Sequence, residues 1–192
     1  MVAWAIDYRL PWKYKIEDIP SCWTMFKQTI FCFLIEDFCF HMAHRLVHCK
    51  AKWLPLYQWI HKQHHDFKQP YSISASYAHP IEQILANFLP NVIGALILGD
   101  SFHFVSFFVF GTLRLIETEE SHSGYDFPFT IFRLIPFGTG AAYHYFHHTH
   151  NVGNYSSFFT IWDTLLDSNK DYYEVYPEEA WFGSETPKKV KQ

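Results

Sequence analysis

The sequence predicts an all-α membrane protein built as a single domain over residues 1–192. Segments with the length and apolar content of helices alternate with short stretches broken by proline and glycine. Histidines recur at spacings of three and four residues, which places them on one face of a helix. Aromatic residues make up 20% of the chain, as in membrane proteins with aromatic belts at both interfaces. A phenylalanine-rich soluble core is the alternative explanation of this last feature.

The candidate membrane segments are weak ones, because none reaches the roughly 20 uninterrupted apolar residues of an unambiguous spanning helix. The first runs from about residue 21 to 40 and contains three charges. The second is a pair of arms, 83–99 and 101–113, joined by a predicted tight turn at Gly99-Asp100. Glu82 before it, and Arg114 and Glu117 after it, are expected to mark where this hairpin leaves the apolar zone. A buried helical hairpin in a soluble protein is the alternative.

A hairpin returns the chain to the side it left, so the histidines before and after it are expected to converge on one site. Four lysines, which favour a cytosolic face, lie on that side: Lys50, Lys52, Lys62 and Lys68. The net charge of -4 gives no basic footprint for nucleic acid. The four cysteines form no C-x-x-C pair and are expected to be reduced thiols.

Three histidine clusters are the most informative feature of the chain. The pattern His-x-x-His-His occurs at residues 61–65 and 144–148, and a pair four residues apart precedes both. Imidazole is the commonest transition-metal ligand near neutral pH. Eight imidazoles are too many for one ion and suit two. The candidate ligands are His44, His48, His61, His64, His65, His144, His147 and His148. His122 is a ninth candidate, because it follows the hairpin on the same side.

Iron is the favoured metal, because a nitrogen-rich shell suits iron that activates dioxygen. A structural zinc site is the first competitor, but it needs only four ligands and usually uses cysteine. A ferritin-like carboxylate site is the second, with Glu119-x-x-His122 and Asp100-x-x-His103 as loose matches. Such pairs are expected by chance in this composition, so they carry little weight.

Several other side chains are candidates for supporting roles. Glu36 and Asp37 lie inside an apolar helix, where a charge is costly unless paired. We expect them to pair with the N–H of a ligand imidazole, or with Arg45. His79, before Pro80, is expected to be a structural loop residue, with a role beside the metal as the alternative. His41, His103 and His150 are not expected to be ligands.

Together the three clusters resemble the fatty acid hydroxylase and sterol desaturase superfamily of membrane diiron enzymes. Residues 35–37, 44–46, 60–62, 77–80 and 122–128 resemble the methylsterol monooxygenase family within it, the C-4 sterol methyl oxidases. Residues 153–157 and 162–163 extend the similarity, which covers roughly residues 20 to 170. Relatives in this family carry more N-terminal hydrophobic sequence, so we expect one or two helices to be missing here.

The resemblance implies a diiron enzyme of the endoplasmic reticulum membrane, with its active site facing the cytosol. It implies that dioxygen and electrons from NAD(P)H, relayed by cytochrome b5 or a similar donor, oxidise a C-4 methyl group of a sterol. The eight clustered histidines carry over as ligands to two iron ions. Asp126 stands where some relatives have another histidine, so it is expected to ligate iron or to orient a ligand.

Other functions would keep the same histidines. Within the superfamily these are a sterol desaturase, a sterol side-chain hydroxylase or dealkylase, and a fatty acid hydroxylase. A non-catalytic metal-binding or degenerate membrane relative is the alternative from another class.

Overall fold

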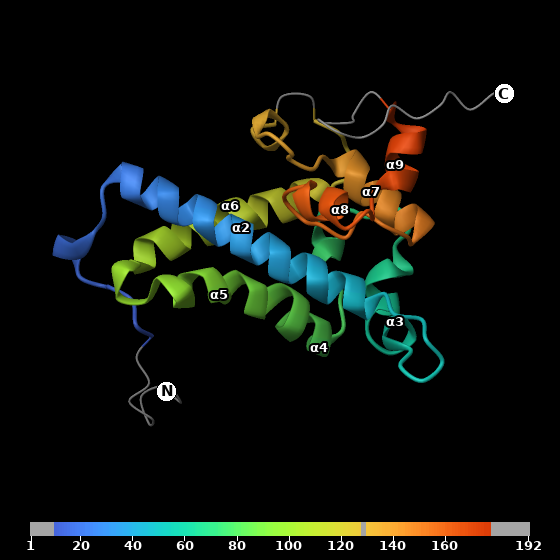
Figure 1. Ribbon diagram of the computed structural model, residues 1–192, viewed down its shortest axis with the longest axis horizontal. Helices are drawn as coiled ribbons and strands as arrows, with labels where there is room; N and C mark the ends of the chain where they lie inside the picture. Colours follow the sequence, from blue (N-terminus) through green and yellow to red (C-terminus); the bar gives the residue numbers. More distant parts are fainter. Residues whose placement is uncertain (1–9, 128–129, 178–192) are drawn as a thin grey trace.

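Helices form the whole framework of the computed structural model, which describes residues 10–127 and 130–177 and has no strand within those ranges. Three long helical segments lie side by side: α2 (Cys22–Val47), the segment ending in α5 (Leu89–Leu98), and α6 (Phe104–Ser121) (Figure 1). Shorter helices gather at one end of this bundle, namely α3 (Leu56–Trp59), α7 (Ala141–His150), α8 (Ile161–Leu165) and α9 (Lys170–Val175). The all-α prediction is confirmed.

Helix α2 joins two segments that the sequence suggested separately, the candidate span at 21–40 and the histidine-bearing stretch that follows. The Ser21 side chain caps its start by accepting the N–H of Thr24 at 3.2 Å. Its 26 residues span about 39 Å. One continuous helix therefore carries His44 from the bundle to the end where the short helices gather.

The predicted hairpin is present. Its first arm consists of α4 (Pro80–Glu82), the π-helix η4 (Gln83–Phe88) and α5, and η5 (Gly99–Ser101) turns the chain into α6. Pro90 explains the wide turn in the first arm, because proline lacks an N–H and its ring clashes with the carbonyl four residues earlier. A π-helical turn relieves that clash without ending the helix.

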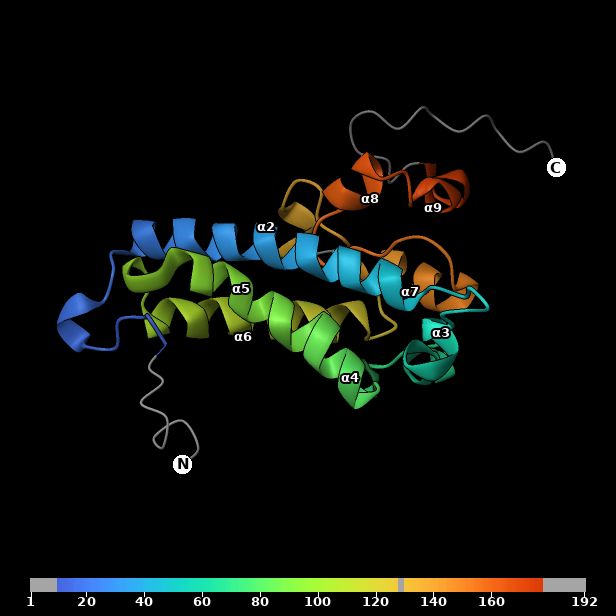
Figure 2. The same cartoon turned by 60° about the horizontal axis from the view of Figure 1, so that its bottom comes forward.

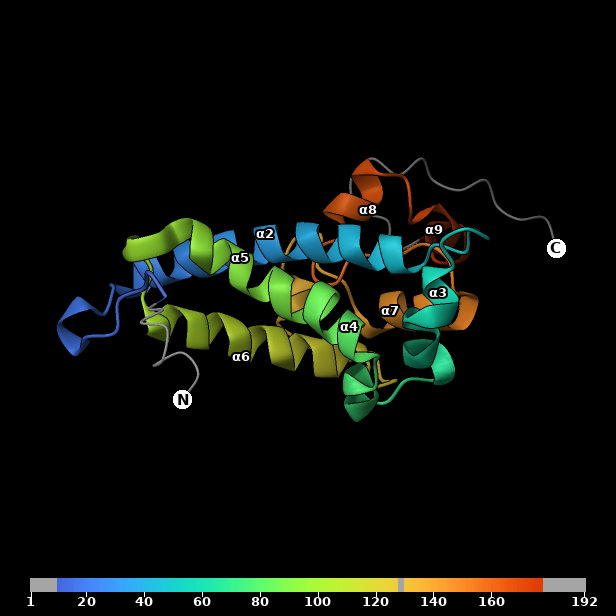
Figure 3. The same cartoon turned by 90° about the horizontal axis from the view of Figure 1, so that it is seen from below.

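Helix α5 packs closely against α2. A Cβ on Gly94 would lie 3.0 Å from the Cα of Cys32, so only glycine allows the two backbones this approach. Phe33 of α2 contacts Phe110 of α6 edge to face, with ring centroids 4.9 Å apart. The turned views show α2, α5 and α6 remaining adjacent along the bundle (Figures 2 and 3). These contacts pack the middle of α2 against both arms of the hairpin.

In the described part of the chain, one helical segment, Pro80–Ser101, is long and apolar enough to cross a membrane. Its apolar side chains are largely outside the core: Phe88 and Ile97 are each 61% exposed. A large apolar surface of this kind fits a membrane protein. The second arm of the hairpin has phenylalanines of both kinds, because Phe102 and Phe110 are buried whereas Phe108 is 66% exposed.

The remaining elements are short turns of 3-10 helix. They are η1 (Ile16–Asp18), η2 (His61–Asp66), η3 (Ser72–Ser76) and η6 (Phe132–Leu134). Of these, η2 matters most for function, because all three of its histidines are buried.

Candidate metal centre

Nine buried histidines meet at the end of the bundle where the short helices gather, as the hairpin topology predicted. They form two groups, and within each group the candidate ligand atoms all lie within 4.8 Å of one another. The five-histidine group consists of His44, His48, His61, His65 and His147. The four-histidine group consists of His64, His122, His144 and His148.

Adjacent histidines serve different groups. The sequence predicted that His61, His64 and His65 share one face, but His64 lies in the other group from its two neighbours. In the same way α7 gives His147 to one group and His148 to the other. Neighbouring side chains on a helix point in directions roughly 100° to 120° apart. Because η2 and α7 lie between the two groups, each supplies both.

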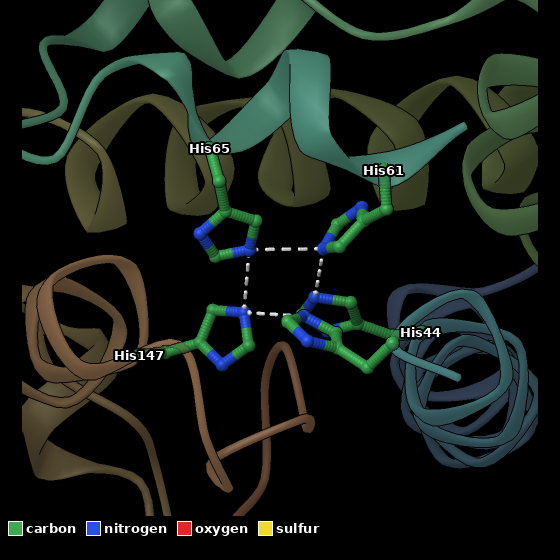
Figure 4. A group of neighbouring side chains, drawn as sticks. His44, His61, His65 and His147 are labelled. Atoms are coloured by element: carbon green, nitrogen blue, oxygen red, sulfur yellow. Dashed lines mark hydrogen bonds between the residues drawn. The ribbon is translucent and has the colours of Figure 1, made fainter. Parts of the chain in front are cut away.

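The Nε2 atoms of the five-histidine group lie as close together as ligands around one ion. Those of His44 and His61 are 3.2 Å apart, those of His61 and His65 are 3.0 Å apart, and those of His65 and His147 are 3.1 Å apart. Figure 4 shows these four rings pointing toward a common centre from α2, η2 and α7. In the four-histidine group the corresponding separations run from 2.9 Å to 3.4 Å.

The Nδ1 atoms of several of these histidines donate hydrogen bonds, so their Nε2 atoms carry no proton in the neutral ring. His44 Nδ1 donates to the Tyr155 carbonyl at 2.8 Å, and His147 Nδ1 donates to the Gly153 carbonyl at 2.6 Å. His61 Nδ1 lies 2.7 Å from a carboxylate oxygen of Glu82. A neutral imidazole with its proton on Nδ1 presents a lone pair at Nε2. Lone pairs that face each other at 3.2 Å cannot bond to each other, but a cation between them satisfies both.

The spacing and number of the nitrogens fit a pair of transition-metal ions better than a structural zinc site. Nitrogens about 2.1 Å from an ion lie about 3.0 Å apart at a right angle and about 3.4 Å apart at the tetrahedral angle. Most separations here match the right angle. A structural zinc site has four ligands and a closed tetrahedron, whereas one group offers five nitrogens. The two groups therefore fit two transition-metal ions.

Burial keeps these imidazoles neutral. It lowers the pKa of His64 to about 4, and it lowers the pKa of His122 to about 3, with a further decrease from the neighbouring His64. Burial likewise lowers the pKa values of His61 and His147 well below their usual range, helped by the surrounding histidines. Neutral imidazole is the form that binds a metal ion.

These shifts predict acid sensitivity of the metal-free chain. The unfolded chain takes up protons near pH 6.5 and the folded chain does not until about pH 4 at His64. The stability of the metal-free protein is therefore expected to fall as the pH decreases between these values. Thermal unfolding in detergent across this range checks the prediction. In the metal-loaded protein the metal occupies the lone pairs, so its stability is expected to fall only at lower pH. A flat pH profile for the metal-free protein would contradict it.

A cavity lies against both histidine groups. His44 and His61 of one group and His64, His122 and His144 of the other line it. The rest of the wall is mixed: Phe40, Ala75 and Ala86 are apolar, whereas Glu82, Asn87, Arg114, Thr118, Ser121 and Ser157 are polar. A molecule in this cavity would therefore lie next to candidate ligands of both ions.

The prediction for Glu36 and Asp37 was wrong. Glu36 accepts a hydrogen bond from Arg114 Nε at 3.0 Å, and Arg114 also pairs with Glu117 at 2.7 Å. Asp37 accepts three backbone N–H groups, those of residues 157 to 159. Glu36 faces Arg114 of α6 and Asp37 faces the loop before α8, so neither makes the expected pair with a ligand imidazole or with Arg45. Arg114 and Glu117, which were expected to flank the hairpin, are buried and paired with each other.

Other candidates lie outside both groups. Asp126 is exposed and belongs to neither. His79 caps α4, with its Nδ1 accepting the N–H of Ile81 at 3.2 Å, which is the structural role expected of it. His103 caps α6, far from the site, through the N–H of Val105. His41 contacts Ser156, and His150 contacts the Phe146 carbonyl.

Comparison with known proteins identifies the chain. The family model described as fatty acid hydroxylase matches residues 29–168. The chain belongs to the fatty acid hydroxylase family. No solved structure matches it.

Within the fatty acid hydroxylase family, methylsterol monooxygenases are among its relatives. The chain is 39% identical to methylsterol monooxygenase 1 of Rattus norvegicus over 166 residues, which is 86% of this chain and 54% of that protein. It is 42% identical to a methylsterol monooxygenase of Aspergillus fumigatus over 154 residues, which is 78% of this chain and 50% of that protein. A very-long-chain aldehyde decarbonylase of Oryza sativa subsp. indica is 39% identical over 157 residues, which is 80% of this chain and 56% of that protein. The chain spans about half the length of these curated relatives.

Some functional groups of this fatty acid hydroxylase chain escaped the sequence analysis. Glu82 faces His61, although its position before an apolar run suggested only a flanking charge. The carbonyls of Tyr155 and Gly153 accept hydrogen bonds from His44 and His147. Because every residue has a backbone carbonyl, residue type does not predict such a contact. The one available signal was Gly153 itself, which has φ of +60°.

Substituting Gly153 by alanine is expected to destabilise the chain by about 1–3 kcal/mol, the usual cost of a strained backbone. An alanine Cβ would lie 2.3 Å from the Ser168 carbonyl oxygen, so the loop must move, and with it the carbonyl that holds His147. Unfolding in detergent, together with metal content, measures both effects.

Gly111→Ala is the matched control, because nothing lies within 4 Å of the added Cβ and the position is in helix α6. Its stability should be unchanged or slightly raised. Equal behaviour of the two variants would contradict the prediction for Gly153.

Proposed function

We propose that this chain forms the catalytic part of a membrane diiron oxygenase that oxidises a sterol C–H bond, most specifically a C-4 methyl group. The observation that carries the proposal is the pair of buried histidine groups whose unprotonated nitrogens face one another beside a shared cavity. Membership of the fatty acid hydroxylase family and the methylsterol monooxygenase relatives support the reaction class and the substrate.

The residues would divide between two iron ions. His44, His48, His61, His65 and His147 would hold one, and His64, His122, His144 and His148 would hold the other. Bound iron would supply the activation of dioxygen, which imidazole ligation suits. The four-histidine group would supply one nitrogen fewer than the five-histidine group.

The protein's own part is orientation and exclusion of water. Hydrogen bonds to Glu82 and to the carbonyls of residues 153 and 155 fix the ring orientation of three histidines and the nitrogen that each presents. Every histidine in the two groups is buried, so bulk water is kept from the reacting centre. Ala86, on the first arm of the hairpin, is buried and lines the cavity, so the membrane-facing arm forms part of the cavity wall.

The cellular setting is part of the proposal. The lysines at the histidine end (Lys50, Lys52, Lys62 and Lys68) are exposed, which supports a cytosolic face on the endoplasmic reticulum membrane. Electrons would come from NAD(P)H through cytochrome b5 or a similar donor that docks on that face. Membrane lipid would surround the hairpin.

An aldehyde is a second candidate substrate. The rice relative named as a very-long-chain aldehyde decarbonylase is as similar to this chain as the rat methylsterol monooxygenase. Because the two relatives are equally identical to this chain, sequence identity does not separate the two substrates. Product analysis with a C-4 methylated sterol and with a long-chain aldehyde distinguishes the two.

Metal content and product formation test the proposal together. The protein purified in detergent should contain two irons per chain and should oxidise a C-4 methylated sterol when given dioxygen and an electron donor. A His147→Ala, His148→Ala double variant removes one histidine from each group, so it should bind both ions more weakly and form no product. One zinc per chain, or no metal in the folded protein, would overturn the proposed enzymatic function and indicate a non-catalytic relative.

A further inference from the structure

The loop between α7 and α8 holds two histidines of the five-histidine group through its backbone. The Tyr155 carbonyl accepts His44 Nδ1 at 2.8 Å, and the Gly153 carbonyl accepts His147 Nδ1 at 2.6 Å. The direction of each carbonyl sets the direction of the imidazole that donates to it. What holds these two peptide groups in place therefore decides how accurately the metal ligands are aimed.

The first peptide group is held by Asp163. In a planar trans peptide the carbonyl and the following N–H point in opposite directions. The N–H paired with the Tyr155 carbonyl belongs to Ser156, and it donates to Asp163 Oδ2 at 2.8 Å. A single rigid plane thus links the Asp163 carboxylate to His44. The N–H of Tyr155 also donates to Asp163, to Oδ1 at 2.9 Å.

The second peptide group leads to the same carboxylate by one more step. The N–H paired with the Gly153 carbonyl belongs to Asn154, and it donates to the Ser168 carbonyl at 2.8 Å. The Ser168 hydroxyl in turn donates to Asp163 Oδ1 at 2.6 Å. His147 is therefore tied to Asp163 through one peptide plane and one serine.

Burial makes these bonds strong and hard to replace. The Asp163 side chain is fully buried, and Tyr143 donates a further hydrogen bond to Oδ2 at 2.8 Å. A buried carboxylate that accepts several hydrogen bonds fixes its donors, because losing any of them leaves charge unsatisfied. Negative charge at one end of a hydrogen-bonded chain also makes the far imidazole a better electron donor to a metal.

Asp37 provides the internal comparison. It too is fully buried, and it accepts the N–H groups of Ser157, Phe158 and Phe159 at 2.7 Å to 3.1 Å. The carbonyls on those peptides point elsewhere: those of Ser157 and Phe158 accept hydrogen bonds from Thr139. Asp37 anchors the same loop without aiming a carbonyl at a histidine.

We propose that Asp163 is a positioning residue for the five-histidine group alone, acting through the peptide groups that end at His44 and His147. This inference rests on the proposed function, because it concerns the two metal ions of that site. No hydrogen bond recorded in the described part of the chain joins Asp163 to the four-histidine group.

Cobalt titration of the purified protein in detergent tests the inference, with the optical spectrum of Co(II) as the readout. The wild type should take up two equivalents. The Asp163→Asn variant should bind the cobalt ion of the four-histidine group with wild-type affinity. It should bind the cobalt ion of the five-histidine group about 10- to 100-fold more weakly, the usual effect of removing a hydrogen-bond partner of a metal ligand. Adding His148→Ala to Asp163→Asn should abolish the retained equivalent. Asp37→Asn should lower thermal stability but keep both equivalents.

Each other outcome has a distinct meaning. Wild-type affinity for both equivalents in Asp163→Asn, or the same selective loss in Asp37→Asn, would overturn the inference and leave the proposed function standing. A wild type that binds no cobalt would overturn both. If Asp163→Asn does not fold, Ser168→Ala replaces it, since it removes only the hydroxyl link toward His147; it should weaken the same equivalent, and no change there would overturn the inference.

Discussion

Replacing Arg114 by methionine is expected to lower the free energy of unfolding by about 3–5 kcal/mol, the usual cost of breaking a buried ion pair from one side. Arg114 lies between Glu36, at 3.0 Å, and Glu117, at 2.7 Å, and all three side chains are buried. Methionine keeps most of the volume but leaves two carboxylates without a cation. Chemical unfolding in detergent measures the loss.

An exposed ion pair serves as the control. Lys15 and Glu17 lie 3.9 Å apart with side chains 74% and 72% exposed, so Lys15→Met should change stability little. An Arg114→Met variant as stable as the wild type would show that Glu36 and Glu117 are protonated in the folded chain. In that case Arg114 would hold them by hydrogen bonds more than by charge.

Removing either of two neighbouring histidines, His64 or His65, is expected to weaken a different metal site in each case. His64→Ala leaves three histidines in its group, and the affinity of that site should fall by more than about 100-fold, since losing even a partner of a ligand costs 10- to 100-fold. His65→Ala leaves four histidines in its group, so its loss should be smaller. Oxidation of substrate should fail in both variants, because the proposed reaction needs both ions.

Metal titration of the two variants, side by side, measures this difference. The adjacent and exposed Lys62 provides the matched control on the same turn, and Lys62→Ala should bind both ions normally. If the two histidine variants lost the same ion, the division of η2 between the groups would be wrong.

Local spacing predicted much of this architecture. Pairs four residues apart, such as His44 and His48, share a group because a helix repeats every 3.6 residues. The turn at Gly99-Asp100 was visible because an apolar run stops there and resumes. Convergence of distant histidines followed from the hairpin, which returns the chain to its starting side.

Partners across long sequence separations were not predictable. Spacing tells which face of α2 carries Glu36, but not that Arg114, 78 residues later, will face it. The split between His64 and His65 depends on where η2 lies relative to two centres, which is a tertiary property. The hydrogen bonds from His44 and His147 end on backbone carbonyls, and every residue type has one.

The facing lone pairs of the histidine groups have a consequence for how much of this protein a cell contains. Without a cation, neutral imidazoles are held nitrogen to nitrogen, so the native state has much to gain from binding one. A ligand that binds only the folded chain stabilises it by about 2.7 kcal/mol at one hundred times its dissociation constant. Stability changes of that size alter steady-state abundance several-fold through chaperones and proteases. Metal shortage would then deplete the polypeptide itself, and its quantity in the membrane would report the cell's supply of the ion.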